Sequence, residues 1–121
     1  MKILISYIVR KIIIYLDVFI HRKKISKFLI KSNLKFKTIY DIGSNNADYS
    51  LLFNEIYSKA NIFSFEPNPE LYKIASTNTK KFSNIEIIKK AVGNSNTIKD
   101  LKIDQNSSLT TTLSTSNKSS N

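Results

Sequence analysis

The first third of the chain carries apolar residues in a pattern that predicts helix. Residues 3–20 are almost wholly apolar, and the few polar positions recur at helical spacing. These positions form one stripe: Ser6, Arg10, Asp17, His21 and Lys24. The other residues cover a wide apolar face, so we expect an amphipathic helix that buries this face in its own domain, in a partner or at a membrane surface. A second helical piece is expected to follow and to end near Ser32 and Asn33.

Beyond residue 37, short apolar runs alternate with segments of helical periodicity. Strands are expected at 38–42, 62–65 and 85–89, and helices at 47–59 and 69–82. Strands that alternate with helices in this way are typical of βαβ units, which form a parallel sheet. The predicted fold class is therefore α/β.

Composition divides the chain into three parts. Residues 1–37 form a basic amphipathic helical segment, and residues 38–105 carry the alternating strands and helices. Within the second part, loose alternation over residues 98–103 predicts a strand or hairpin arm. Residues 106–121 are polar, with Lys118 as the one charged side chain, and are expected to be a poorly ordered tail.

The net charge of +10 belongs almost entirely to the N-terminal segment. Residues 1–37 hold ten basic residues and one acidic residue, a net charge of +9, which leaves +1 for the rest of the chain. Basic terminal segments contact anionic membranes or nucleic acid in some proteins, but most are solvated helix faces. We favour the solvated face and expect no nucleic-acid partner.

The apolar N-terminal residues do not fit a membrane span or a secretory signal. Arg10, Lys11 and Asp17 would each cost about 2.5–3.5 kcal/mol at the centre of a span. No small-residue cleavage site follows the apolar run. We therefore expect a cytoplasmic protein, with peripheral membrane contact through residues 3–24 as the alternative.

The chain has no cysteine and one histidine. A disulfide framework and zinc ligation by thiolates are therefore excluded, and no metal site is expected. His21 follows Asp17 by four residues, a spacing at which the two side chains can pair on a helix surface, and it is given no catalytic role.

Two strand-like runs end in an acidic residue, and this is the main signal of a site. The first run ends at Asp41 and is followed by Gly43-Ser44-Asn45, and the second ends at Glu66-Pro67-Asn68. In parallel sheets, ligands bind beyond the carboxyl ends of the strands, so both stops should lie together. The plainer alternative is a turn followed by an ordinary helix start, with Asn68 as N-cap and Glu66 supporting the helix terminus.

The spacing of the two stops suits a cofactor that contains adenosine. A glycine after a strand allows close backbone approach, and an acidic residue roughly 20 positions later can accept hydrogen bonds from ribose hydroxyls. A dinucleotide requires a loop with several glycines, but this loop has only Gly43 and carries Asp48, which would repel phosphate. S-adenosylmethionine has no phosphate and carries a sulfonium and an ammonium group, so it is the favoured cofactor.

The sequence "DIGSNNADYS" and the later "FSFEPNPELYKIASTNTKKFSNIEIIKKAVGN" resemble the FkbM-type methyltransferases. The resemblance covers about residues 38–113. It implies a partial Rossmann-like class I methyltransferase fold, with parallel strands in the order 1-2-3 preceded by N-terminal helices. It also implies O-methyl transfer from S-adenosylmethionine to a hydroxyl group of a sugar, glycan or other small molecule.

By position, the resemblance assigns a role to each candidate residue, with no catalytic base among them. Asp41, Gly43 and Asn45 would line the methionine end of the cofactor, together with Ser44 from the same loop. Glu66 would hold the ribose, and Pro67, Asn68 and Ala91 would border the adenine.

Two departures from the family pattern raise alternatives. Ala47 stands where the family usually has glycine, and the strands that would follow in the family are missing from these 121 residues. The chain is therefore expected to represent the cofactor-binding half, with an exposed strand edge that favours self-association. The alternatives are a non-catalytic remnant that retains the cofactor loops, and a membrane-peripheral or interaction module that acts through its basic helix.

Overall fold

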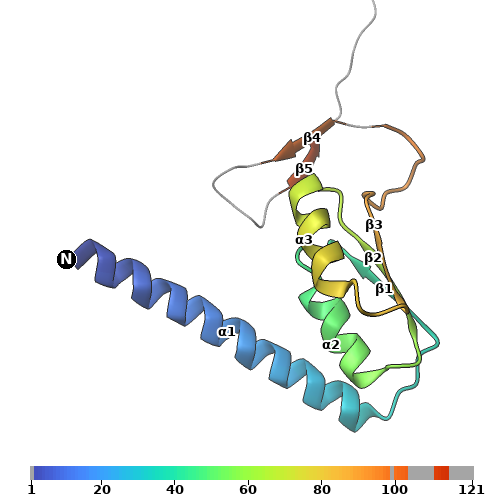
Figure 1. The fold of residues 1–121 in the computed structure, drawn as a ribbon, viewed down its shortest axis with the longest axis horizontal. Coiled ribbons are helices and arrows are strands. Elements are labelled where there is room, and N and C mark those ends of the chain that lie inside the picture. Colours follow the sequence, from blue (N-terminus) through green and yellow to red (C-terminus); the bar gives the residue numbers. More distant parts are fainter. Residues whose placement is uncertain (1, 99, 104–110, 115–121) are drawn as a thin grey trace, which may run out of the picture.

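The computed structural model describes residues 2–98, 100–103 and 111–114, which form an α/β fold with a long N-terminal helix (Figure 1). The elements, in order, are α1 (Lys2–Ser32), β1 (Thr38–Ile42), α2 (Asp48–Ile56), β2 (Asn61–Phe65), α3 (Pro69–Thr79), β3 (Ile85–Ile88), β4 (Asp100–Ile103) and β5 (Thr111–Ser114). The predicted fold class is confirmed. Both crossover helices end three residues earlier than expected, at Ile56 and Thr79.

The first three strands form a parallel sheet in the order β1-β2-β3, as predicted. In the register, Ile62 pairs with Ile39 on one side and with Ile85 on the other. Both crossovers run in the same direction along the sheet, and right-handed connections then place α2 and α3 on one face (Figure 1). This is half of a doubly wound, Rossmann-like arrangement.

The two faces of this sheet differ strongly in burial. On the face toward α2 and α3, Ile62 is 1 % exposed and packs in a small core with Leu52 and Ala75. On the opposite face, Tyr40 and Ile42 remain more than 60 % exposed, although the ring of Tyr40 stacks on Phe63. No described helix covers this second face. Self-association stays a prediction, and the surfaces through which we expect it are this uncovered face and the free edge of β1.

The N-terminal segment is one continuous helix, so the prediction of two helical pieces was wrong. No glycine or proline interrupts residues 2–32, and the hydrogen-bond ladder therefore continues to Ser32. The end is as predicted: Asn33 takes the left-handed conformation that commonly follows a helix, with φ of 52°. None of the described helices combines the length and apolar content that crossing a membrane would require.

The last two described strands form a separate antiparallel pair. β4 confirms the strand or hairpin arm predicted at residues 98–103. Its partner β5, Thr111–Ser114, lies within the segment that was expected to be a poorly ordered tail, and that expectation stays a prediction. Residues 104–110 and 115–121 of the second and third predicted parts lie outside the described residues.

Candidate functional site

The loop between β1 and α2 depends on three left-handed residues at alternate positions. Gly43, Asn45 and Ala47 have φ of 77°, 52° and 68°. Glycine takes this conformation without steric cost and asparagine tolerates it, whereas for other residues it costs roughly 1–2 kcal/mol. Ala47 is fully buried, and its backbone conformation explains why glycine suits this position.

Hydrogen bonds fasten this loop to the end of β2. The amides of Gly43 and Ser44 both donate to the carbonyl oxygen of Phe65, at 2.9 and 3.0 Å. The amide of Asn45 donates to Oε2 of Glu66 at 2.8 Å. The two stops predicted from the sequence are therefore in direct contact.

Glu66 links the two loops through both of its carboxylate oxygens. While Oε2 accepts from Asn45, Oε1 accepts from the amide of Asn68 at 2.9 Å. The side chain is only 4 % exposed, so these hydrogen bonds compensate for much of the loss of hydration. Glu66 thus supports the start of α3, which was the plainer alternative, and also holds the first loop.

A cleft with a volume of about 550 Å³ opens beside these loops. Five of the predicted site residues line it: Gly43, Ser44, Asn45, Glu66 and Pro67. Its wall also includes Val18 and Arg22 of α1, two residues that were not predicted from the sequence to belong to the site. No local signal marks these two residues, because their position depends on how α1 packs against α2.

The other three predicted residues lie outside this cleft. Ala91 lines a neighbouring cavity of about 160 Å³, which also contacts Gly43 and Pro67. Asn68 caps α3, with its Oδ1 accepting from the amides of Glu70 and Leu71. Ala91 is therefore adjacent to the cleft, and the polar side chain of Asn68 has a structural role.

Asp41 points toward α2 and joins a buried hydroxyl network. Its Oδ2 accepts from Oγ of Ser50 at 2.6 Å, and that hydroxyl lies 2.5 Å from Oγ of Ser64. Because Ser50 has a single hydroxyl proton to donate to Asp41, Ser64 acts as the donor to Ser50. Burial raises the pKa of Asp41 above its ordinary value of 3.8, and the hydrogen bonds from Ser50 oppose this rise. Asp41 thus joins β1 to α2.

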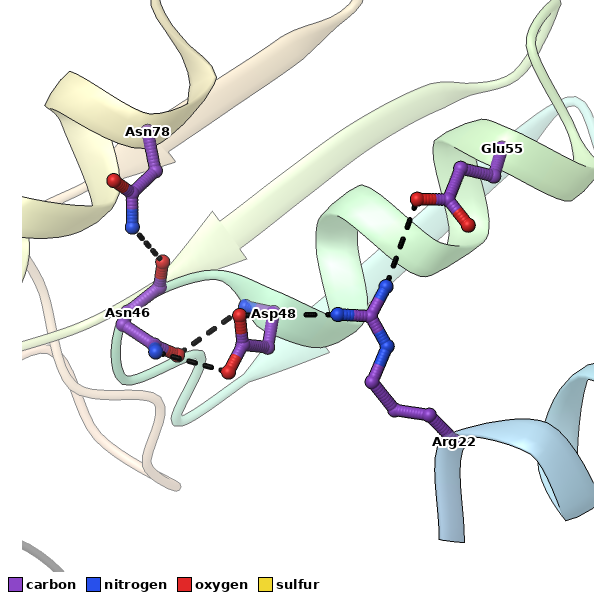
Figure 2. Close-up of polar contacts among 5 residues, drawn as sticks. All are labelled: Arg22, Asn46, Asp48, Glu55 and Asn78. Atoms are coloured by element: carbon purple, nitrogen blue, oxygen red, sulfur yellow. Dashed lines mark hydrogen bonds and ion pairs between the residues drawn. The ribbon is translucent and has the colours of Figure 1, made fainter. Parts of the chain in front are cut away.

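An ionic contact positions α1 beside the cleft (Figure 2). The guanidinium group of Arg22 lies 3.6 Å from Glu55 and 4.0 Å from Asp48, both on α2. The predicted pair of His21 and Asp17 is not formed among the described residues, and Arg22, the next residue along, makes the contact with the domain.

The loop residue Asn46 extends this contact toward α3. Its side-chain amide donates to Oδ2 of Asp48 at 2.9 Å, while its backbone carbonyl accepts from Asn78 at the same distance (Figure 2). The loop is therefore held from three sides, by α2, α3 and β2.

No protein-family profile matches the sequence, and no curated protein is similar to it. Among solved structures, the chain resembles precorrin-6y C5,15-methyltransferase from Geobacter metallireducens GS-15, with 28 % sequence identity and a TM-score of 0.45. The similarity covers 51 % of this chain and 34 % of that protein, so it spans about a third of the length of the other protein. A likeness with so low a TM-score carries no functional argument.

Proposed function

We propose that this chain binds S-adenosylmethionine and forms the cofactor-binding half of a methyltransferase. The observation that carries the proposal is the meeting of Glu66 with the Gly43–Asn45 loop in one cleft. This cleft lies at the carboxyl ends of β1 and β2, where ligands of open parallel sheets bind.

Two features of the cleft fit a bound cofactor. Oγ of Ser44 is buried and lacks a hydrogen-bond partner among the described residues, although Ser44 lines the cleft. A Cβ atom added to Gly43 would meet no atom within 4 Å, so the space in front of this backbone is free for a ligand. The cleft volume also falls within the range of roughly 300–1,000 Å³ that is usual for small-molecule sites.

The charges in the cleft favour a cationic ligand over a dinucleotide. Asp48 and Glu66 both line it, and the positive charge of Arg22 is opposed by Asp48 and Glu55. Carboxylates attract a sulfonium or ammonium group and repel phosphates. The single glycine of the loop points the same way, since a pyrophosphate site uses several.

The cofactor contacts are assigned to Glu66, Ser44, Pro67 and Ala91. Glu66 uses one acceptor position on each oxygen for the loop amides, and each oxygen has a second one for a ribose hydroxyl. Ser44 offers an unpaired hydroxyl, and Pro67 with Ala91 would border the adenine. Asp41 and Asn68 act as positioning residues, because their side chains already bond Ser50 and α3. When bound, S-adenosylmethionine supplies an electrophilic methyl group.

The acceptor is proposed from the resemblance to FkbM-type methyltransferases. Their activity implies a hydroxyl oxygen of a sugar, glycan or other small molecule as the nucleophile. No described residue in the cleft is an evident general base, so this chain contributes cofactor binding and orientation.

Isothermal titration tests the proposal. The full chain is titrated with S-adenosylmethionine and, separately, with NAD⁺, and we expect saturable binding of the first alone. Ser44→Ala should weaken binding about five- to tenfold through the loss of one hydrogen bond. The matched control is Ser83→Ala, at an exposed serine outside the cleft. Failure to bind S-adenosylmethionine, or tighter binding of NAD⁺, would refute the proposal.

A methyl-transfer assay separates the enzyme from its closest alternative. Release of S-adenosylhomocysteine in the presence of sugar or glycan acceptors would support the transferase. Binding without such release would favour a cofactor-binding remnant without catalysis.

A further inference from the structure

The N-terminal part of α1 exposes more apolar surface than any other described segment. Between Tyr7 and Ile20, eleven apolar side chains are each at least 44 % exposed, including Ile13 at 60 % and Tyr15 at 73 %. Soluble monomers rarely expose so many neighbouring apolar side chains, and those that do generally use them to bind a partner or a membrane.

One broad face of this part of α1 is apolar, and lysines occupy the same face of the helix farther toward its C-terminal end. Ile12, Leu16 and Phe19 follow one another at helical spacing, and Lys23 and Lys27 continue the same face at the same spacing. The polar stripe with Arg10 and Asp17 lies on the other side of the helix.

The packing of α1 leaves Ile12 and Leu16 accessible, whereas Phe19 and Lys23 also line the groove between α1 and α2. Arg22 fastens the helix to α2 through Glu55 and Asp48. Ile25 and Leu29, which lie close to the direction of Arg22 around the helix, are partly buried. The N-terminal half of α1 extends away from α2 and α3 (Figure 1). The apolar face formed by Ile12 and Leu16 is turned by about a third of the circumference from the anchoring side.

We propose that this face of α1 binds the surface of an anionic lipid bilayer, with the helix lying in the plane of the interface. The charge distribution selects this occupant: residues 1–37 carry +9 and the rest of the chain +1. Anionic headgroups complement this charge, and lysines beside an apolar helix face strengthen such binding. Packing against α1 of a second copy would instead bring two such basic segments together. The proposal does not depend on the cofactor assignment.

Cosedimentation of the full chain with vesicles tests the proposal. One set of vesicles is phosphatidylcholine alone, and the other contains equal parts of phosphatidylcholine and phosphatidylglycerol. We expect binding to the anionic vesicles and at least about tenfold weaker binding to the neutral ones, because several lysines near the surface contribute about fivefold each. Added salt should weaken the binding to anionic vesicles.

Two pairs of variants divide the apolar from the charged contribution. Ile12→Ser with Leu16→Ser should reduce vesicle binding about tenfold or more, whereas Ile74→Ser, at an isoleucine on α3 that is 47 % exposed, should not. Lys23→Gln with Lys27→Gln should also reduce it, and Lys73→Gln with Lys80→Gln, both exposed on or after α3, should have little effect. Circular dichroism confirms that each variant retains its helix content.

Three results would overturn the proposal. If the chain binds neither kind of vesicle, a lipid surface is excluded as the partner. If it binds both equally well, attraction by anionic headgroups is excluded. The third is a dimer, detected by sedimentation without lipid, that dissociates in the variant with Ile12→Ser and Leu16→Ser and whose formation competes with vesicle binding. In that case the face belongs to a second copy of the chain.

Discussion

The two loops that form the cleft achieve their shapes by different means. The loop after β1 depends on backbone conformation, with left-handed residues at positions 43, 45 and 47. The loop after β2 has no left-handed residue and is held by side-chain hydrogen bonds instead. Glu66 accepts hydrogen bonds from two backbone amides, and Asn68 caps α3. The first loop is therefore sensitive to a side chain added at Gly43, where the backbone is left-handed, and the second loop is sensitive to the loss of a side-chain oxygen atom.

The largest effect is expected at Glu66, because it joins both loops. Glu66→Ala would leave the amides of Asn45 and Asn68 without their charged acceptor and should lower the free energy of unfolding by about 3 kcal/mol. S-adenosylmethionine binding should fall with it. Glu66→Gln keeps one carbonyl acceptor and should recover part of both losses. The measurement is urea denaturation followed by ligand titration.

Glu86→Ala is the matched control, since Glu86 is exposed on β3 and its side chain makes no hydrogen bond or ion pair among the described residues. If Glu66→Ala were no more harmful than Glu86→Ala, the link between the loops would have no energetic weight.

Gly43→Val should follow, and it tests the first loop alone. A β-branched residue at φ of 77° should cost about 2 kcal/mol of stability, and its side chain would occupy the cleft and abolish cofactor binding. Gly93→Val is the control, because Gly93 has open space around it and no left-handed backbone. Thermal unfolding separates the two contributions. Full binding by a folded Gly43→Val variant would remove this glycine from the site.

Asn68→Ala tests the second loop with a smaller change. Loss of the N-cap oxygen should destabilise the protein by about 1 kcal/mol. Asn68→Asp supplies the same acceptor and should restore the stability. Because the backbone amide of Asn68 still reaches Glu66, we expect cofactor affinity to change less than threefold or so. A loss of affinity as large as that of Glu66→Ala would mean that the side chain contacts the cofactor.

The smallest effect, and the one gain, is expected at Ala47. Ala47→Gly relieves a left-handed alanine but removes a buried methyl group, so the net stabilisation should be below about 1 kcal/mol. Differential scanning calorimetry can resolve this change. Ala60→Gly is the comparison, because Ala60 is equally buried but has no left-handed backbone, and it should only destabilise. Similar losses in both variants would show that Ala47 carries no strain.

The sequence predicted the sheet well, because its signals are local. The β-branched and aromatic runs at 38–42, 62–65 and 85–89 correspond to β1, β2 and β3 within one residue at each end. The contact between the two stops also followed from strand topology. By contrast, two helical pieces were expected where α1 is one helix, because the basic residues between the two apolar runs are good helix formers and continue it.

The parts of the site that the sequence did not predict depend on packing. Arg22 reaches the cleft only because α1 lies against α2, which no spacing along the chain reveals. Asp41 was assigned to the cofactor from the resemblance, yet alternation along β1 turns its side chain to the helix-covered face, where Ser50 bonds it. Asp41 pairs with Ser64 in the strand register. The alternation of side chains along β1 was therefore enough to predict that Asp41 faces the helices.

The most direct test of the account is to follow both loops during one titration. Backbone amide NMR signals of the full chain are recorded while S-adenosylmethionine is added. We predict that Gly43, Ser44 and Asn45 shift together with Glu66 and yield one dissociation constant, while Ser83 stays unchanged. Shifts confined to one loop, different constants for the two, or no saturable shift in either would contradict the claim that they form a single cofactor site.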